Sequence, residues 1–194
     1  HPLQDELAGR SWQLPATLGL PTQRPLLALL PGSRTGEIRT MLPIMLQAAQ
    51  AMPQVQPVVA GAPGQDAALY HRMMQEVGIE APLLFGYTYD LVAASRAACV
   101  ASGTATLETA LLGTPQVVLI KVPKVTYWVG QRLVRVQALS LVNLLLERRA
   151  LVNPAVPELI QDVCTADNLA RHTKELLADG PAREAQLQAY AELR

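Results

Sequence analysis

The feature that most constrains this chain is a series of short apolar segments that alternate with helical patterns. The apolar segments are Leu26 to Leu30, Pro57 to Ala60, Leu83 to Phe85, Ala97 to Val100 and Gln116 to Ile120. The helical patterns between them cover about residues 37–50, 66–77, 90–94 and 104–112. Short apolar strands separated by helices are typical of a parallel sheet that is covered on both faces. The sequence therefore predicts a doubly wound α/β domain.

The two ends of the chain lack this alternation. Residues 1–25 contain several prolines and no sustained periodicity, which predicts a connector leading into a sheet domain at 26–122. Residues 123–194 predict a mainly helical extension that packs on this domain or on a partner subunit. Its expected helices are Thr126 to Arg135, Ala166 to Leu177 and Ala182 to Leu193. The opening His1-Pro2-Leu3 is not an initiator sequence and suggests a fragment or processed chain.

Composition and missing motifs exclude several classes of function. Sixteen cations balance sixteen anions, so no global charge attracts the chain to nucleic acid. The two cysteines have no paired spacing, which disfavours a disulfide or a zinc site. Neither GxxxxGK nor GxGxxG occurs, which disfavours ATP hydrolysis and hydride transfer, and the absence of GxSxG disfavours a serine hydrolase.

Polar loops follow two of the predicted strands. In an open parallel sheet, ligands bind beyond the carboxyl ends of the strands. The loop after the first strand brings Ser33 and Arg34 to the start of a helix, where free amides and the helix dipole favour an anion. The residues alone fit a plain strand-to-helix turn with an exposed arginine equally well.

The loop after the fourth strand is richer in hydroxyl groups. Ser102, Gly103 and Thr104 open a helix that also contains Glu108 one turn later. Their hydroxyls suit a diphosphate, and the carboxylate suits the two hydroxyls of a ribose. The alternative for Glu108 is a first-turn carboxylate that complements the helix dipole. The presence of both loops in one sheet favours a nucleotide diphosphate as the ligand.

Four segments of the chain, in this order and spacing, resemble the lipid-A-disaccharide synthase family. They are Leu30-Pro31-Gly32-Ser33-Arg34 with Glu37-Ile38, Ser102-Gly103-Thr104-Ala105-Thr106-Leu107-Glu108, Ser140-Leu141-Val142-Asn143-Leu144, and Val156-Pro157-Glu158-Leu159-Ile160-Gln161. The resemblance covers nearly the whole chain but only the carboxy-terminal half of the enzyme. It implies one Rossmann-like half of a GT-B glycosyltransferase of family 19.

The resemblance also implies an activity and a set of site residues. The family transfers 2,3-diacylglucosamine from UDP to 2,3-diacylglucosamine 1-phosphate, without metal or cofactor, and forms the lipid A disaccharide. In this hexosyltransferase the general base belongs to the other domain, and Asn143 is a further catalytic candidate. Residues expected to contact the UDP-sugar are Ser33 and Arg34 at a phosphate, Ser102, Gly103 and Thr104 at the diphosphate, Glu108 at the ribose, and Phe85, Gly86 and Tyr87 at the uracil.

The resemblance implies a cytoplasmic homodimer that is peripheral on the inner face of the inner membrane. Between Glu108 and Glu147 no acidic residue occurs, and four cations surround Tyr127 and Trp128. These cations are Lys121, Lys124, Arg132 and Arg135. Cations beside interfacial aromatic residues suit an anionic membrane surface. The alternative is that the apolar residues pack internally and leave ordinary solvated cations.

Some positions differ from the family pattern. Val142 replaces a common proline, Leu146-Glu147-Arg148 replaces a small turn, and Arg96 replaces an acidic residue that we interpret as a surface change. Rival functions are another UDP-sugar GT-B enzyme, such as an N-acetylglucosaminyltransferase or an epimerase, and a non-catalytic nucleotide-sugar-binding or dimerisation module. The SLVN and VPELIQ segments argue against the rival enzymes.

Overall fold

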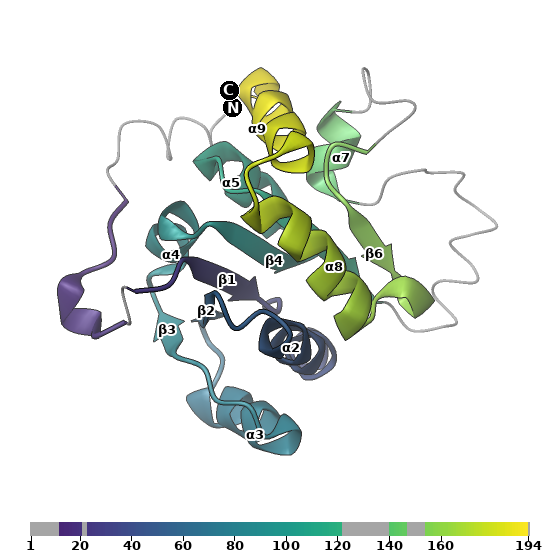
Figure 1. Cartoon of the computed structure of the whole chain (residues 1–194). Helices are drawn as coiled ribbons and strands as arrows, with labels where there is room; N and C mark the ends of the chain where they lie inside the picture. Colours follow the sequence, from purple (N-terminus) through teal and green to yellow (C-terminus); the bar gives the residue numbers. More distant parts are fainter. Residues whose placement is uncertain (1–11, 21–22, 122–139, 147–153, 194) are drawn as a thin grey trace.

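Six parallel strands form a single sheet at the centre of the molecule (Figure 1). The computed structural model describes residues 12–20, 23–121, 140–146 and 154–193. The strand order is β3-β2-β1-β4-β5-β6. The strands are β1 (Leu26–Leu30), β2 (Gln56–Gly61), β3 (Leu83–Phe85), β4 (Ala97–Ala101), β5 (Gln116–Ile120) and β6 (Glu158–Ile160). The predicted doubly wound α/β fold is confirmed, and the direction of winding reverses between β1 and β4.

Helices cover both faces of the sheet. One face packs against α2 (Thr35–Gln50), α3 (Ala67–Val77) and α8 (Ala166–Leu177). The opposite face packs against α4 (Thr88–Ala94), α5 (Thr104–Leu112), α7 (Leu141–Leu146) and α9 (Pro181–Leu193). Two short 3-10 helices, η1 (Ala16–Leu18) and η2 (Gln161–Val163), lie in the connecting segments. None of the helices in the described ranges is long and apolar enough to cross a membrane.

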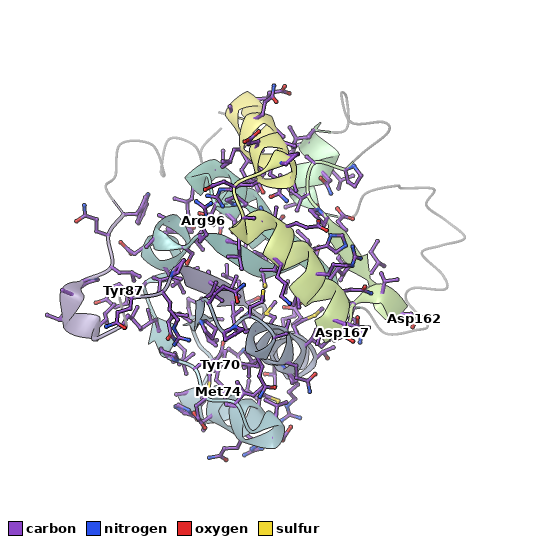
Figure 2. All side chains as sticks on the ribbon, in the orientation of Figure 1. Tyr70, Met74, Tyr87, Arg96, Asp162 and Asp167 are labelled. Atoms are coloured by element: carbon purple, nitrogen blue, oxygen red, sulfur yellow. The ribbon has the colours of Figure 1, made fainter. Side chains whose placement is uncertain are left out.

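Burial on both faces explains why the strands are continuously apolar. Successive side chains of a strand point to opposite faces, so Leu27 and Leu29 join the core under α2 while Ala28 and Leu30 join the core under α4. The side chains of Tyr70 and Met74 on α3 are fully buried against the first of these cores (Figure 2). A strand with one wet face would show alternating polar residues instead.

Helix α2 contains the buried face that its sequence predicts. The helix begins at Thr35, two residues before the predicted start, and continues through Pro43 to Gln50. The predicted core positions are all buried, namely Ile38, Leu42, Met45, Leu46 and Ala49. The amino end of this helix therefore lies directly beyond the carboxyl end of β1.

The carboxy-terminal extension contributes a strand that the sequence does not predict. Strand β6 pairs in parallel with β5, from Val118 opposite Glu158 to Ile120 opposite Ile160. It is only three residues long and begins with a charged residue, so it lacks the continuous apolar run of the other strands. Helices α8 and α9 lie where helices are predicted, with α9 starting one residue early at Pro181. The helix predicted for 126–135 lies outside the described residues.

Candidate functional site

A cavity of about 490 Å³ opens at the carboxyl ends of the strands. Residues from the loops after β1, β2, β3 and β4 line this cavity, together with Trp12 from the connector. The cavity lies where the strand order reverses, because the loops after the neighbouring strands β1 and β4 both line it. In open parallel sheets this crevice is the usual ligand site.

The structure brings six of the predicted site residues to this one cavity. They are Ser33 from the β1–α2 loop, Gly86 after β3, and Ser102, Gly103, Thr104 and Glu108 from the β4–α5 region. Pairing of Leu30 with Val100 places the ends of β1 and β4 side by side. The two loops selected from their local composition therefore face the same space.

Three other predicted residues do not line the cavity. The Arg34 side chain is 85% exposed and lies 3.1 Å from a carboxylate oxygen of Glu37. The Phe85 ring packs over Gly61 and meets Tyr70 edge to face, with ring centroids 5.8 Å apart. The half-buried Tyr87 packs against the core under α4 (Figure 2). Of the segment predicted to contact uracil, only Gly86 lines the cavity.

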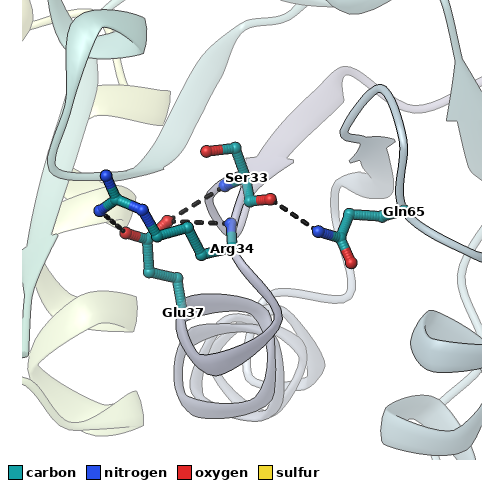
Figure 3. A network of polar contacts seen from close by, with 4 residues as sticks. All are labelled: Ser33, Arg34, Glu37 and Gln65. Carbon is teal, nitrogen blue, oxygen red and sulfur yellow. Dashed lines mark hydrogen bonds and ion pairs between the residues drawn. The ribbon is translucent and has the colours of Figure 1, made fainter.

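The β1–α2 loop is tied to helix α2 by one carboxylate (Figure 3). The backbone N–H groups of Ser33 and Arg34 both donate to Glu37 Oε2, at 3.1 and 3.2 Å. Gly32 has a φ of 104°, and a Cβ there would lie 2.6 Å from the same oxygen. A glycine is therefore required for both backbone conformation and space.

Helix α5 presents its amino end to the cavity. Its first flanking residue, Gly103, has no side chain that could cap the helix, and Ser102 and Thr104 on either side of it line the cavity. The Thr106 hydroxyl instead donates to the Gly103 carbonyl at 2.8 Å. The helix dipole at this end favours a negatively charged ligand.

The connector supplies site residues that sequence reasoning misses. Trp12 lines the cavity and meets Tyr89 in an edge-to-face contact, with centroids 5.2 Å apart and ring planes at 76°. The backbone N–H of Gln13 donates to Asp90 Oδ1 at 3.0 Å and holds the connector against the start of α4. The sequence carries no local signal for these contacts, which join segments 77 residues apart.

The charges on the cavity wall are acidic. In the described part of the chain, the residues of the lining that carry a charge at neutral pH are Glu37, Asp90 and Glu108, and no lysine or arginine lines the cavity. Glu37 pairs with Arg34 just outside the wall, and Asp90 accepts from the connector. An anionic ligand in this cavity would therefore depend on hydroxyls, backbone amides and helix dipoles, with Arg34 as the cation attached to the wall.

The remaining predicted residue, Asn143, does not line the cavity. Its side chain is buried and makes two hydrogen bonds with the backbone of Val156, at 2.8 and 3.0 Å. It also donates to Glu158 Oε1, which accepts from the N–H and hydroxyl of Ser140. The SLVN and VPELIQ segments thus contact each other through these polar groups, and the carboxamide of Asn143 fixes α7 to the strand β6.

The strand order and the position of the cavity define a Rossmann-like domain, and its fold is the one seen in halves of GT-B glycosyltransferases. The spinosyn rhamnosyltransferase SpnG in complex with thymidine diphosphate superposes with a TM-score of 0.59 at 17% identity, over 94% of this chain and 44% of that one. The carboxy-terminal CMP-Kdo binding domain of WaaA from Acinetobacter baumannii superposes with a TM-score of 0.55 at 14% identity, over 99% and 97%.

Sequence comparison identifies the family within this class. The model of the lipid-A-disaccharide synthetase family matches residues 1–193. The lipid-A-disaccharide synthase of Myxococcus xanthus is 42% identical over 181 residues, which are 91% of this chain and 46% of that protein. The chain therefore belongs to the lipid-A-disaccharide synthase family, as the four sequence segments predict. It spans about half the length of the curated relatives that it matches.

Proposed function

We propose that this chain is the UDP-binding half of a lipid-A-disaccharide synthase. The enzyme would transfer 2,3-diacylglucosamine from UDP to the 6-position of 2,3-diacylglucosamine 1-phosphate and release UDP. The observation that supports this most directly is the single cavity at the strand reversal, which collects both hydroxyl-bearing loops and Glu108. The related fold that was solved with thymidine diphosphate supports a nucleoside diphosphate as the ligand.

Each end of the cavity suits a different part of the nucleotide. We assign the diphosphate to the hydroxyls of Ser102 and Thr104 at the amino end of α5, where the helix dipole favours anions, and to the Ser33 hydroxyl from the β1–α2 loop. Glu108, one turn further along, would accept hydrogen bonds from the two ribose hydroxyls. The uracil would lie near Gly86 and the perpendicular rings of Trp12 and Tyr89, where a planar base can stack on one ring and contact the other.

The catalytic base would come from the other half of the enzyme. Three carboxylates line this cavity in the described part of the chain: Glu108 is assigned to the ribose, Asp90 already accepts from the connector, and Glu37 is paired with Arg34. The acceptor sugar must bind on the open side of the donor, which in a GT-B enzyme faces the second domain. The chain as given is therefore expected to bind UDP without catalysing transfer.

Calorimetry with UDP and an assay for disaccharide formation test the two parts of this proposal. We expect saturable UDP binding by the chain alone, and transfer only when the amino-terminal half is supplied. Absence of UDP binding would contradict the assignment of this cavity as the UDP site. Robust transfer by this chain alone would show that the other half is unnecessary.

Membrane association and dimerisation form a second part of the proposal. Of the four cations that suggest an anionic lipid surface, Lys121 is described, and Lys124, Arg132 and Arg135 lie outside the described residues. Each cation near an anionic surface contributes about 1 kcal/mol. The fraction of protein that sediments with anionic vesicles should therefore fall as the salt concentration rises. Neutral vesicles should bind little protein at any salt concentration. Equal binding to both vesicle types would contradict the assignment of these cations to an anionic lipid surface. Light scattering of the protein in solution tests separately whether it is a homodimer.

A further inference from the structure

One carboxylate organises the whole β1–α2 loop. Glu37 accepts hydrogen bonds from the N–H of Ser33 and of Arg34 through one oxygen, and pairs with the Arg34 guanidinium at 3.1 Å through the other. A carboxylate is an efficient partner here because both oxygens accept and the negative charge complements the amino end of α2. These two backbone amides of the loop are therefore used within the protein.

The loop and the carboxylate fit each other closely. The nearest approach to a Cβ built on Gly32 would be the Glu37 carboxylate oxygen, at 2.6 Å, followed by Glu37 Cβ at 2.9 Å. Only a residue without a side chain therefore fits at position 32 beside Glu37. The hydrogen bonds from the Ser33 and Arg34 N–H groups to Glu37 hold the loop in this place.

A second side chain holds the same loop from the opposite side (Figure 3). Gln65, from the loop between β2 and α3, donates its amide to the Ser33 carbonyl at 2.8 Å. Its carbonyl oxygen accepts from the Thr35 hydroxyl at 3.3 Å. Ser33 is therefore fixed through its N–H by Glu37 and through its carbonyl by Gln65, which leaves only its hydroxyl to meet a ligand.

The negative charge of Glu37 would by itself weaken the binding of an anionic ligand. Glu37 lines the cavity, and an unpaired carboxylate there would repel a diphosphate. Its pairing with Arg34 offsets this charge and keeps the guanidinium at the edge of the wall. The sign of the net effect on nucleotide affinity therefore depends on whether positioning or repulsion is larger.

We propose that Glu37 is a positioning residue for the nucleotide phosphates, acting through Ser33 and Arg34, and that positioning outweighs repulsion. This inference rests on the proposed UDP site. Glu37 would not contact UDP itself. It would hold the Ser33 hydroxyl and the Arg34 guanidinium where a diphosphate can reach them, with Gln65 as the second support.

Two substitutions separate the functions of the carboxylate. Glu37→Gln keeps an oxygen for the two amides but removes the charge that pairs with Arg34, whereas Glu37→Ala removes both. We expect UDP affinity to fall about tenfold in Glu37→Gln, the order expected for a lost charge-assisted hydrogen bond, and further in Glu37→Ala. Uridine affinity should change less than twofold in Glu37→Gln, because the base and ribose lie elsewhere in the cavity.

A double-mutant cycle tests whether Glu37 acts through Arg34. In an Arg34→Ala background, Glu37→Gln should no longer weaken UDP binding and should restore part of the affinity, because the pair is already broken and the carboxylate left alone repels the diphosphate. Gln65→Ala should lower UDP affinity in the same selective way. Glu76→Gln on α3 is the matched control, since it removes an equal charge from an exposed residue outside the cavity.

Several results would overturn the proposal. Tighter UDP binding by Glu37→Gln would mean that the carboxylate acts mainly by repulsion. Equal losses for UDP and uridine would indicate general damage to the fold, which thermal unfolding of each variant measures separately. Additive effects of the Arg34 and Glu37 substitutions would exclude action through the pair. If the unsubstituted chain does not bind UDP, the proposed function itself fails, and that outcome is distinct from unchanged affinities in the variants.

Discussion

At the scale of single residues, the structure gives polar side chains roles that their positions in the sequence do not indicate. Arg96 is an example, because it looks like a surface substitution beside a buried strand. Its guanidinium donates to the Leu177 carbonyl at 3.1 Å and pairs with Asp179, and its own carbonyl accepts from Arg183 at 2.7 Å. Hydrogen bonding to Arg96 holds the pKa of Asp179 below its ordinary value. Arg96 therefore joins the α8–α9 turn to the amino end of β4, away from the cavity.

The buried amide of Asn143 allows a test of structural against catalytic roles. Asn143→Ala leaves the N–H and carbonyl of Val156 without their side-chain partner and removes one of the hydrogen bonds to the Glu158 carboxylate, which should cost about 2–4 kcal/mol of unfolding free energy. Urea unfolding measures this loss. UDP affinity of the folded fraction should stay unchanged.

Asn168→Ala is a suitable control, because the carboxamide hydrogen bonds of Asn168 lie at the surface and their loss should cost under about 1 kcal/mol. Unchanged stability of Asn143→Ala, together with lost transfer in the complete enzyme, would make Asn143 a catalytic residue instead.

Two glycines only four positions apart should respond to alanine with opposite signs. Gly32→Ala forces a side chain into a positive φ and toward Glu37, so it should destabilise the protein by about 1–3 kcal/mol and weaken UDP binding. Gly36→Ala has open space in the first turn of α2 and should stabilise by up to about 1 kcal/mol. Thermal unfolding compares them, and a Gly32→Ala variant as stable as Gly36→Ala would contradict the assigned loop geometry.

At the scale of elements, local pattern predicts those helices and strands whose sequence has a strong signal of its own. Strands β1, β3 and β5 and helices α5 and α8 begin and end where the sequence predicts. Strand β6 is missed because pairing with β5, and not its own composition, makes it a strand. Helix α4 begins at Thr88 and not at Asp90, which moves Tyr89 from a predicted loop into the cavity wall.

The candidate site divides in the same way. The loops containing Ser33 and Ser102 are predictable because glycine and hydroxyl residues follow buried strands directly. The sequence does not predict that Trp12, Asp90 and Glu37 line the cavity. Their positions depend on contacts between distant segments or on the path of a loop. For the same reason Phe85 and Tyr87, which the family resemblance assigns to the uracil, lie outside the cavity lining.

The connector supplies an optical test of the base end of the cavity. The chain has two tryptophans, Trp12 and Trp128, so Trp128→Phe leaves Trp12 as the only one. We expect UDP and uridine to quench this fluorescence by stacking, and inorganic diphosphate to leave it nearly unchanged. Trp12→Phe, with Trp128 retained, is the control and should lose most of the response. Calorimetrically saturating UDP without any change in Trp12 emission would place the base elsewhere.

At the scale of the whole molecule, the carboxy-terminal helix completes the sheet. Strand β6 pairs with β5 only from Val118 onward, so it does not reach Gln116. The side chain of Gln186 on α9 takes that place, accepting from the Gln116 N–H at 2.9 Å and donating to its carbonyl at 3.0 Å. Tyr190 donates to the same Gln186 oxygen at 2.7 Å. Helix α9 therefore belongs to the cooperative unit of the domain.

Loss of the Gln186 side chain should lower the unfolding free energy of the whole domain. Gln186→Ala leaves two buried backbone groups of Gln116 without partners and should cost about 2–3 kcal/mol. Gln188→Ala, an exposed change on the same helix, should cost under about 0.5 kcal/mol. Circular dichroism at increasing temperature measures both, with a single shared transition expected. A Gln186 variant that loses only the helical signal of α9 and keeps the remaining transition would show that α9 is an independent appendage.

The reversal of strand order between β1 and β4 also affects how ligand and fold depend on each other. One wall of the cavity comes from residues before 95 and the other from residues after 96, so the two halves of the chain create the site only by docking. A nucleotide held between them acts as a non-covalent cross-link that the unfolded chain cannot bind. A ligand that binds only the folded chain stabilises it by mass action. At a free UDP concentration of about one hundred times the dissociation constant, UDP would add about 2.7 kcal/mol to the free energy of unfolding. Cellular nucleotide levels would thereby influence how long this polypeptide survives proteolysis, apart from any turnover that it supports.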